Sequence, residues 1–300
     1  MPRPRPALAL VLALAVWPAP ARGGGDDRVP LAENFTAEEL GATAVLSALN
    51  LGLALAEPSL VELRDPALGV WGWDEAISDA LYPGPGAGRF GWGVPDLTGE
   101  VALPAVTIGF YAADALALWG KGTSISGDPN ADHELFALLE GYSATVFLTE
   151  AAKLGVGRTR PVLALDRPDP PDLGEEATLS FFSGHTSSSF YLAAFLWRDL
   201  SDWLVYDKLG DATDGTRLWA GRIAPAAALY GVAGVVGLSR IIDQRHYFSD
   251  VLVGALVGGA AGNLAYALHF DGAGRPRRRH GPGRLQVVAG PGGVGVAGAF

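Results

Sequence analysis

The sequence contains no cysteine, so thiolate catalysis, iron–sulfur clusters, cysteine-ligated zinc and disulfide bonds are all excluded. Basic residues are also scarce, because only 22 of the 300 residues are Lys or Arg, against 32 Asp and Glu, and the formal net charge is −10. A chain with this charge lacks the broad positive surface that binds nucleic acid, so no nucleic-acid partner is expected. Any site for an anion must therefore be built locally.

Apolar residues, by contrast, are abundant. Hydrophobic residues make up 49% of the chain, and 41 Gly and 21 Pro accompany them. This composition is too apolar for a disordered chain, so a packed core is expected, in one large domain or two small ones. The mean hydropathy of +0.23 lies between the values typical of soluble enzymes and of multi-span membrane proteins, so composition alone does not choose between them.

Residues 1–21 have the layout of a secretory signal peptide. Two arginines precede an apolar run over residues 7–17, and an A-x-A cleavage site follows at residues 19–21. We expect export with cleavage rather than a retained membrane anchor, because the apolar run is short for a membrane span. The protein is therefore expected in the cell envelope. Residues 22–34, which follow the signal peptide, are expected to form a linker.

Long apolar stretches separated by Gly- and Pro-rich polar loops predict an all-α domain over residues 35–270. The expected fold is a helical bundle of about five to six helices. The expected helices cover residues 37–56, 101–119, 134–152, 185–204, 222–238 and 250–268. In the last of these, Gly254, Gly258 and Gly262 are four residues apart, which allows close packing of helix backbones.

Two segments fall outside this pattern. Residues 58–100 combine many aromatic residues with Gly and Pro, and we expect them to form a loop packed on the helices, with a lid or a membrane-interface element as the alternatives. Residues 271–300 form a basic and then Gly-rich tail, expected to be poorly ordered or to make one short strand.

Three groups of polar residues stand at the ends of the apolar helices, where an unpaired charge is costly. Each group alone has an ordinary explanation, as a snorkelling lysine, a helix cap or a surface His–Asp contact. The groups are Lys153 with Arg160-Pro161, then Ser183-Gly184-His185, then Ser239-Arg240 with His246 and Asp250.

Together these groups suit phosphoryl transfer. Three cations and the N–H groups of a helix N-terminus can neutralise the charge on phosphate oxygens in the transition state. One histidine can attack phosphorus while the other protonates the leaving oxygen. The combination therefore predicts an enzyme that acts on a phosphate ester.

The order Lys-x6-Arg-Pro, Ser-Gly-His and Ser-Arg-x5-His-x3-Asp resembles the three-part signature of the type 2 phosphatidic acid phosphatase and vanadium-dependent haloperoxidase superfamily. The motifs span Lys153 to Asp250, and the surrounding helices, at about residues 100–268, fit the helical-bundle core of that family. Phe182 is a departure, because the family most often has Pro at this position; this affects the entry to the helix rather than the chemistry.

The resemblance implies a role for each matched residue. His246 matches the nucleophile that forms a phosphohistidine, Asp250 matches the carboxylate that fixes its tautomer, and His185 matches the general acid. The phosphate-binding residues are Lys153, Arg160, Ser183, Gly184 and Arg240. No metal or other cofactor is implied, and vanadate would act as an inhibitor, or as the cofactor in a haloperoxidase. The other histidines, His133, His269 and His280, match no motif and are expected on the surface or in loops.

The expected function is a metal-independent phosphatase acting on a phosphomonoester or diphosphate of a lipid. A vanadium-dependent haloperoxidase and a soluble periplasmic non-specific acid phosphatase are the alternatives within the family. A chain of this length, with few residues outside the core, favours a phosphatase, because haloperoxidases are usually longer. A structural or binding envelope protein without turnover is a further alternative, against which the intact histidines argue.

The position of the motifs along the helices also predicts where the protein is located in the cell. The three motifs must meet at one end of the bundle, so Arg275–Arg279 would lie at the opposite end. If the helices span a membrane, this positive charge marks the cytoplasmic face and places the active site outside. With a cleaved signal peptide, residues 37–56 cannot span, which leaves five spans. Most of the segments have only about 16–18 residues, short of the roughly 20 of a comfortable span, so a soluble bundle remains the alternative to a membrane-embedded one.

Overall fold

The computed structural model describes residues 29, 31–61, 68–85, 129–168, 173–279, 284–290 and 293–299. The expected signal peptide and the helix expected at residues 101–119 lie outside the described residues. The linker expected at residues 22–34 is described in part, and its last four residues form the short helix α2 (Leu31–Asn34).

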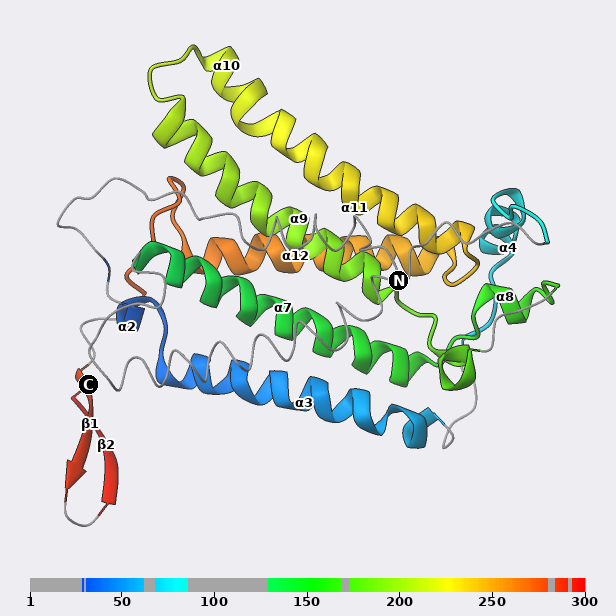
Figure 1. The fold of residues 1–300 in the computed structure, drawn as a ribbon, viewed down its shortest axis with the longest axis horizontal. Helices are drawn as coiled ribbons and strands as arrows, with labels where there is room; N and C mark the ends of the chain where they lie inside the picture. The colour runs from blue at the N-terminus through cyan, green and yellow to red at the C-terminus, as the bar shows by residue number, and fades with distance from the viewer. Residues whose placement is uncertain are drawn as a thin grey trace, which may run out of the picture.

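The domain is all-α, as expected from the sequence (Figure 1). Its long helices are α3 (Ala37–Val61), α7 (Pro129–Val156), α9 (Gly184–Asp202), α11 (Ala224–Ile242) and α12 (Phe248–His269). The shorter elements are α4 (Gly72–Ala80), α8 (Pro161–Ala164), the 3₁₀-helix η2 (Gly174–Thr178), the π-helical turns η3 (Trp203–Lys208) and η4 (Trp219–Ile223), and α10 (Asp214–Leu218). The long helices confirm the five expected helices that fall within the described residues.

The aromatic segment and the tail carry more regular structure than expected. The segment at residues 58–100 contains α4, a helix that begins where Trp71 stacks on Trp73 at 5.7 Å between ring centroids. We expected the C-terminal tail to be poorly ordered or to make one short strand, but it forms an antiparallel hairpin of β1 (Arg284–Gly290) and β2 (Gly293–Ala299).

From α7 onward the long helices alternate in direction, so that all three motifs meet at one end of the bundle. Figure 1 shows α7 and α11 ending on the side of the molecule where α9 and α12 begin, with α4 and α8 beside them. Helix α3 lies along α7 and runs in the same direction. We call the end where α9 and α12 begin the site end, and the opposite end the far end.

Helices α9 and α12 touch along their backbones. The glycines of α12 lie directly against carbonyl oxygens of α9, which are those of Ser183, Ser187 and Tyr191 for Gly254, Gly258 and Gly262 respectively. A Cβ atom at Gly258 would overlap with the Ser187 carbonyl, and one at Gly254 would lie 2.8 Å from the Ser183 oxygen. This contact, which we call the glycine seam, confirms the close packing predicted from the spacing of the three residues.

The core at the far end is mainly aromatic. Tyr266 stacks on Phe270 at 4.8 Å between centroids, and Phe195 meets both rings edge to face. Phe35, which directly follows α2, is also buried here and stacks on His269 at 4.3 Å. Flat rings fill the space where α7, α9 and α12 converge.

The expectation that His133 and His269 lie on the surface or in loops is wrong, because both side chains are buried at the far end. Asn34 lies between them: its Nδ2 is 2.9 Å from His133 Nδ1, and its Oδ1 is 3.1 Å from His269 Nδ1. The other ring nitrogen of His269 is 2.9 Å from a carboxylate oxygen of Glu140. The imidazoles are buried because α2 supplies the hydrogen-bonding partner that burial requires. His280 lies outside the described residues.

Two of the described helical stretches are long and apolar enough to cross a membrane, residues 214–242 and α12. Both present large apolar side chains to the outside. These are Leu218, Trp219, Ile223, Val232, Val235 and Leu238 on the first stretch, and Phe248, Leu252, Leu256, Leu264 and Leu268 on the second. An outward-facing apolar surface of this kind suits a lipid environment better than water.

Candidate active site

The Ser183-Gly184-His185 motif forms the N-terminus of α9, as the sequence predicts. Ser183 is the N-cap, and its side-chain oxygen accepts hydrogen bonds from the Thr186 backbone N–H at 3.4 Å and from the Thr186 hydroxyl at 2.9 Å. The backbone N–H of Ser183 donates to the carbonyl of Asp250 at 3.1 Å. This bond joins the start of α9 to the start of α12, so the second and third motifs are held together.

Lys153, in the last turn of α7, reaches the same helix start. A Cβ atom placed on Gly184 would lie 3.4 Å from the Lys153 Nζ atom, so the ammonium group packs against the first residue of α9. The side chain is buried, and Nζ also forms an ion pair of 2.8 Å with Glu150, one turn earlier on α7. A cation and a helix N-terminus therefore lie side by side, which is an arrangement that attracts anions.

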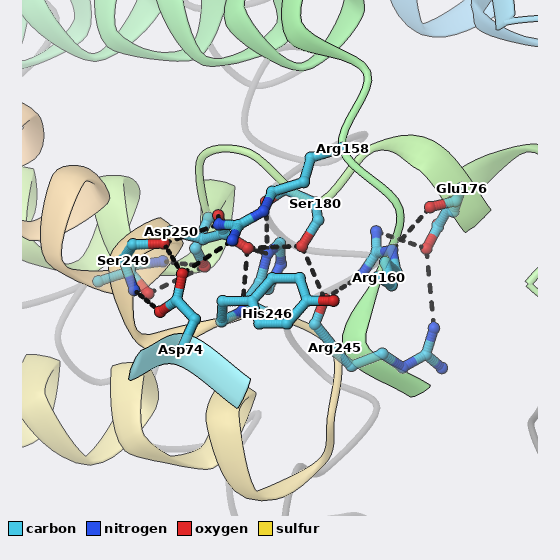
Figure 2. Close-up of polar contacts among 12 residues, drawn as sticks. Asp74, Arg158, Arg160, Glu176, Ser180, Arg245, His246, Ser249 and Asp250 are labelled. Atoms are coloured by element: carbon cyan, nitrogen blue, oxygen red, sulfur yellow. Dashed lines mark hydrogen bonds and ion pairs between the residues drawn. The ribbon is translucent and has the colours of Figure 1, made fainter. Parts of the chain in front are cut away.

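His246 lies in the short loop between α11 and α12 and is only 2% exposed. Its Nδ1 atom is 2.7 Å from the backbone carbonyl oxygen of Ser180 (Figure 2). Because a carbonyl oxygen can only accept a hydrogen bond, Nδ1 carries the proton of the neutral ring. The lone pair is then on Nε2, which is the atom that the predicted nucleophilic role requires.

The electrostatic surroundings of His246 link it to the other two motifs. Burial is the main cause that lowers the pKa of His246 well below its ordinary value, and the positive charges of Arg160, His185 and Lys153 lower this pKa further. The hydrogen bond to the Ser180 carbonyl acts in the opposite direction. The ring is therefore neutral at neutral pH, as a nucleophile must be, and it lies within the field of the predicted phosphate-binding cations.

Asp250 was expected to bind His246 directly and fix its tautomer, but the nearest carboxylate oxygen is 3.9 Å from Nδ1. The Ser180 carbonyl takes that position instead. Asp250 accepts hydrogen bonds from the Ser180 hydroxyl at 2.5 Å, from the Tyr247 N–H at 2.9 Å and from Arg158 at 2.6 Å. Its carboxylate thus holds Ser180, which in turn holds the histidine ring (Figure 2).

Arg160 follows the end of α7 and is the N-cap residue of α8. Its guanidinium donates to the Glu176 backbone carbonyl at 2.7 Å and to the Glu176 carboxylate at 3.0 Å. Arg245 approaches the same carboxylate at 3.8 Å. Glu176 therefore occupies the Nε–Nη2 edge of a guanidinium that the motif assigns to phosphate, and an incoming phosphate would compete with it (Figure 2).

Arg240 holds the loop that carries His246. Its backbone carbonyl accepts the N–H groups of Arg245 at 3.0 Å and His246 at 3.2 Å, which closes the end of α11. Its guanidinium lies 3.2 Å from the Ser239 hydroxyl and 3.5 Å from the Asp243 carboxylate. The phosphate-binding roles of all five predicted residues remain predictions; these are Lys153, Arg160, Ser183, Gly184 and Arg240.

Four residues that sequence reasoning missed join this network: Asp74, Arg158, Ser180 and Ser249. Arg158 is fully buried and forms ion pairs of 2.8 Å with Asp74 and 2.6 Å with Asp250. Its only signal in the sequence is its position two residues before the motif arginine. Asp74, in α4, gives no signal at all. Among the described residues, no group of three or more histidine and acidic side chains is placed to hold a metal ion.

Comparison with known proteins extends this picture. A family model described as the PAP2 superfamily matches residues 134–272, which include all three motifs but not Asp74. No solved structure gives a significant match to the chain.

Curated relatives are also found. Phospholipid phosphatase 1 of Mus musculus is 30% identical over 202 residues, covering 58% of this chain and 67% of the relative. The Rattus norvegicus protein of the same name is 34% identical over 143 residues, 41% of this chain and 47% of the relative. Phospholipid phosphatase 2 of Homo sapiens is 32% identical over 167 residues, 48% of this chain and 54% of the relative. The chain thus spans about half the length of the last two.

Proposed function

This chain belongs to the PAP2 superfamily, and on that basis we propose that it is a phosphatase that hydrolyses a phosphomonoester or diphosphate carried by a lipid. The observation that carries the proposal is the state of His246. It is buried and neutral, its proton is held on Nδ1 by the Ser180 carbonyl, and Lys153, Arg160 and His185 surround it with positive charge.

The first step is nucleophilic attack. Nε2 of His246 donates its lone pair to phosphorus, the bond from phosphorus to the ester oxygen breaks, and a phosphohistidine forms. His185, protonated, gives its proton to the departing oxygen, so the product leaves as an alcohol or as a monophosphate. Lys153, Arg160 and the Gly184 N–H neutralise the charge on the other phosphate oxygens. The positive ring of the phosphohistidine is stabilised through Ser180 and Asp250.

The second step releases phosphate. His185, now neutral, takes a proton from water while the water oxygen attacks phosphorus, and the bond between phosphorus and Nε2 breaks. Inorganic phosphate leaves, and both histidines return to their starting states. The two proposed steps need no metal ion and no redox cofactor, because basic residues of the chain neutralise the phosphate charge and His185 transfers each proton.

A lipid substrate is supported by the names of the relatives, which are phospholipid phosphatases, and by the outward apolar surface of the last helices. Helix α12 has 22 residues, or about 33 Å at 1.5 Å per residue, close to the roughly 30 Å of a bilayer core. His246 precedes this helix, and the basic residues 277–279 follow it. We therefore place the protein in the envelope membrane, with the site end on the periplasmic face.

The test is phosphate release by purified full-length protein, with and without detergent, from phosphatidate, a prenyl diphosphate and p-nitrophenyl phosphate. We expect release from at least one lipid, inhibition by vanadate, and a loss of at least about 10³-fold in His246→Ala. Unchanged hydrolysis in that variant would overturn the mechanism.

The same assay separates the alternatives. Release from the soluble ester alone would identify an acid phosphatase of low specificity. Absence of phosphate release together with halide oxidation by peroxide in the vanadate-loaded protein would identify a haloperoxidase. Inactivity in both assays would leave a binding role.

A further inference from the structure

Asp74 lies outside the segment that matches the family, yet its carboxylate is fully buried at the site end. Its Oδ1 accepts the backbone N–H of Ser249 at 2.9 Å, and its Oδ2 accepts the Ser249 hydroxyl at 2.6 Å. The same Oδ2 forms the ion pair of 2.8 Å with Arg158. Every one of these contacts crosses from α4 to the catalytic core (Figure 2).

The contact with Ser249 caps α12 from outside. Ser249 is the second residue of this helix, and its N–H is one of those that have no partner within the helix. A carboxylate at this position also meets the positive end of the helix dipole. Asp74 therefore stabilises the first turn of α12, which begins two residues after His246 and contains Asp250.

Arg158 connects the two buried carboxylates. It binds Asp74 through Nη2 and Asp250 through Nη1, and Nη1 also donates to the Ser249 hydroxyl at 2.7 Å. The guanidinium lies over the ring of Tyr247 at 4.0 Å and that of Trp71 at 5.0 Å. Since two ring contacts and the hydrogen bonds of both Nη atoms hold the guanidinium, its Nη1 donor is held against Asp250.

The network of Asp74, Arg158 and Asp250 carries a net charge that affects His246. Two carboxylates and one guanidinium leave one net negative charge beside a histidine that is surrounded by cations. A negative charge in a dry site stabilises the positive ring that forms when His246 is phosphorylated. Neutralising Asp74 removes that charge and leaves Arg158 paired with Asp250 alone, which draws Asp250 away from Ser180.

We propose that Asp74 is a positioning residue for the phosphatase reaction, acting through Arg158 and Ser249 on Asp250, and so on the orientation of His246. The proposal rests on the proposed function. It makes α4, an element outside the family match, part of the catalytic apparatus, although Asp74 itself touches no substrate.

The test compares Asp74→Asn with Asp79→Asn, a control on the same helix whose exposed ion pair with Arg167 lies outside the network. Hydrolysis of p-nitrophenyl phosphate is measured per active site, with the sites counted by vanadate titration. This count separates a loss of folded protein from a slower reaction. We expect kcat per site to fall at least tenfold in Asp74→Asn, with KM within threefold of the wild-type value, and to stay unchanged in Asp79→Asn.

A double variant tests whether Asp74 affects kcat through Arg158. If Asp74 acts through Arg158, the loss of kcat in Asp74→Asn with Arg158→Lys should match the larger of the two single losses. Losses that multiply would overturn this route. If vanadate titration finds no active sites in Asp74→Asn, Ser249→Ala is tested instead, because that change deletes only the bridging hydroxyl. In Ser249→Ala, kcat per site should fall at least threefold.

The outcomes distinguish the two proposals. If the wild-type protein is active and His246→Ala is not, wild-type kcat per site in Asp74→Asn or in Ser249→Ala overturns the role of Asp74 and leaves the phosphatase assignment intact. An inactive wild-type protein overturns the phosphatase assignment, and the role of Asp74 with it.

Discussion

His246 Nδ1 donates a hydrogen bond of 2.7 Å to the backbone carbonyl of Ser180. A backbone acceptor fixes the ring without adding a charge beside it, unlike the carboxylate that the sequence motif led us to expect there. The tautomer is therefore set by the course of the chain before α9, while Asp250 acts from a distance, by holding Ser180 and the start of α12.

The lowered pKa of His246 predicts how stability depends on pH. The folded protein keeps this ring neutral at pH values where the unfolded chain, with its ordinary pKa near 6.5, binds a proton. The contribution of His246 to stability is therefore complete above about pH 6.5 and is lost as the pH falls toward the folded pKa. The thermal midpoint of the wild-type protein should drop more steeply below about pH 6.5 than that of His246→Asn. Parallel curves for the two proteins would contradict the assignment.

His185→Ala should slow the departure of poor leaving groups most. An alkoxide needs a proton from the general acid as it leaves, whereas p-nitrophenolate is stable without one. We expect a loss of about 10²- to 10⁴-fold for an alkyl phosphate and a clearly smaller loss for p-nitrophenyl phosphate, measured as kcat/KM. Equal losses for the two esters would count against an acid role for His185.

Glu176→Gln should strengthen the binding of phosphate analogues. The Glu176 carboxylate now holds Arg160 at 3.0 Å and is itself 46% exposed, so its neutralisation removes, at small cost, the ion pair that competes with phosphate for Arg160. Vanadate inhibition should tighten about two- to fivefold, the range that an exposed ion pair of up to about 1 kcal/mol allows. Glu33→Gln is the matched control, because Glu33 pairs with Arg278 at the far end. Weaker inhibition in Glu176→Gln would show that Glu176 helps to place Arg160.

Gly258→Ala should destabilise the bundle, whereas Gly259→Ala should not. The added methyl group at Gly258 overlaps with the Ser187 backbone, but nothing lies within 4 Å of the same group at Gly259. We expect the free energy of unfolding to fall by about 1–3 kcal/mol or more in Gly258→Ala. In Gly259→Ala it should rise by about 0.5–1 kcal/mol, because alanine favours the helix. Denaturant unfolding of both variants checks this, and similar values for the two would refute the glycine seam as a tight contact.

The sequence predicted those structural features that depend on residues close to each other along the chain. The five described long helices, the helix start at Gly184 and the glycine spacing of α12 could all be predicted, since each depends on a local pattern. The network around Arg158 could not, because Asp74 and Asp250 lie 84 and 92 residues away from it. Burial of His269 depends in the same way on Asn34, 235 residues away. Such pairings depend on the folded topology, which no local pattern encodes.

The glycine seam also limits how the catalytic parts can shift. Its three contacts recur every four residues, so α9 and α12 pack in one register. If one helix slid along the other, the glycines would face equivalent positions again only after about 6 Å, which is the rise of four helical residues. His185 is the second residue of α9 and His246 lies two residues before α12, so sliding the helices by that distance would move the two histidines relative to each other by the same amount. The glycine seam therefore fixes how the proposed acid and the proposed nucleophile are placed relative to each other along the helix axes.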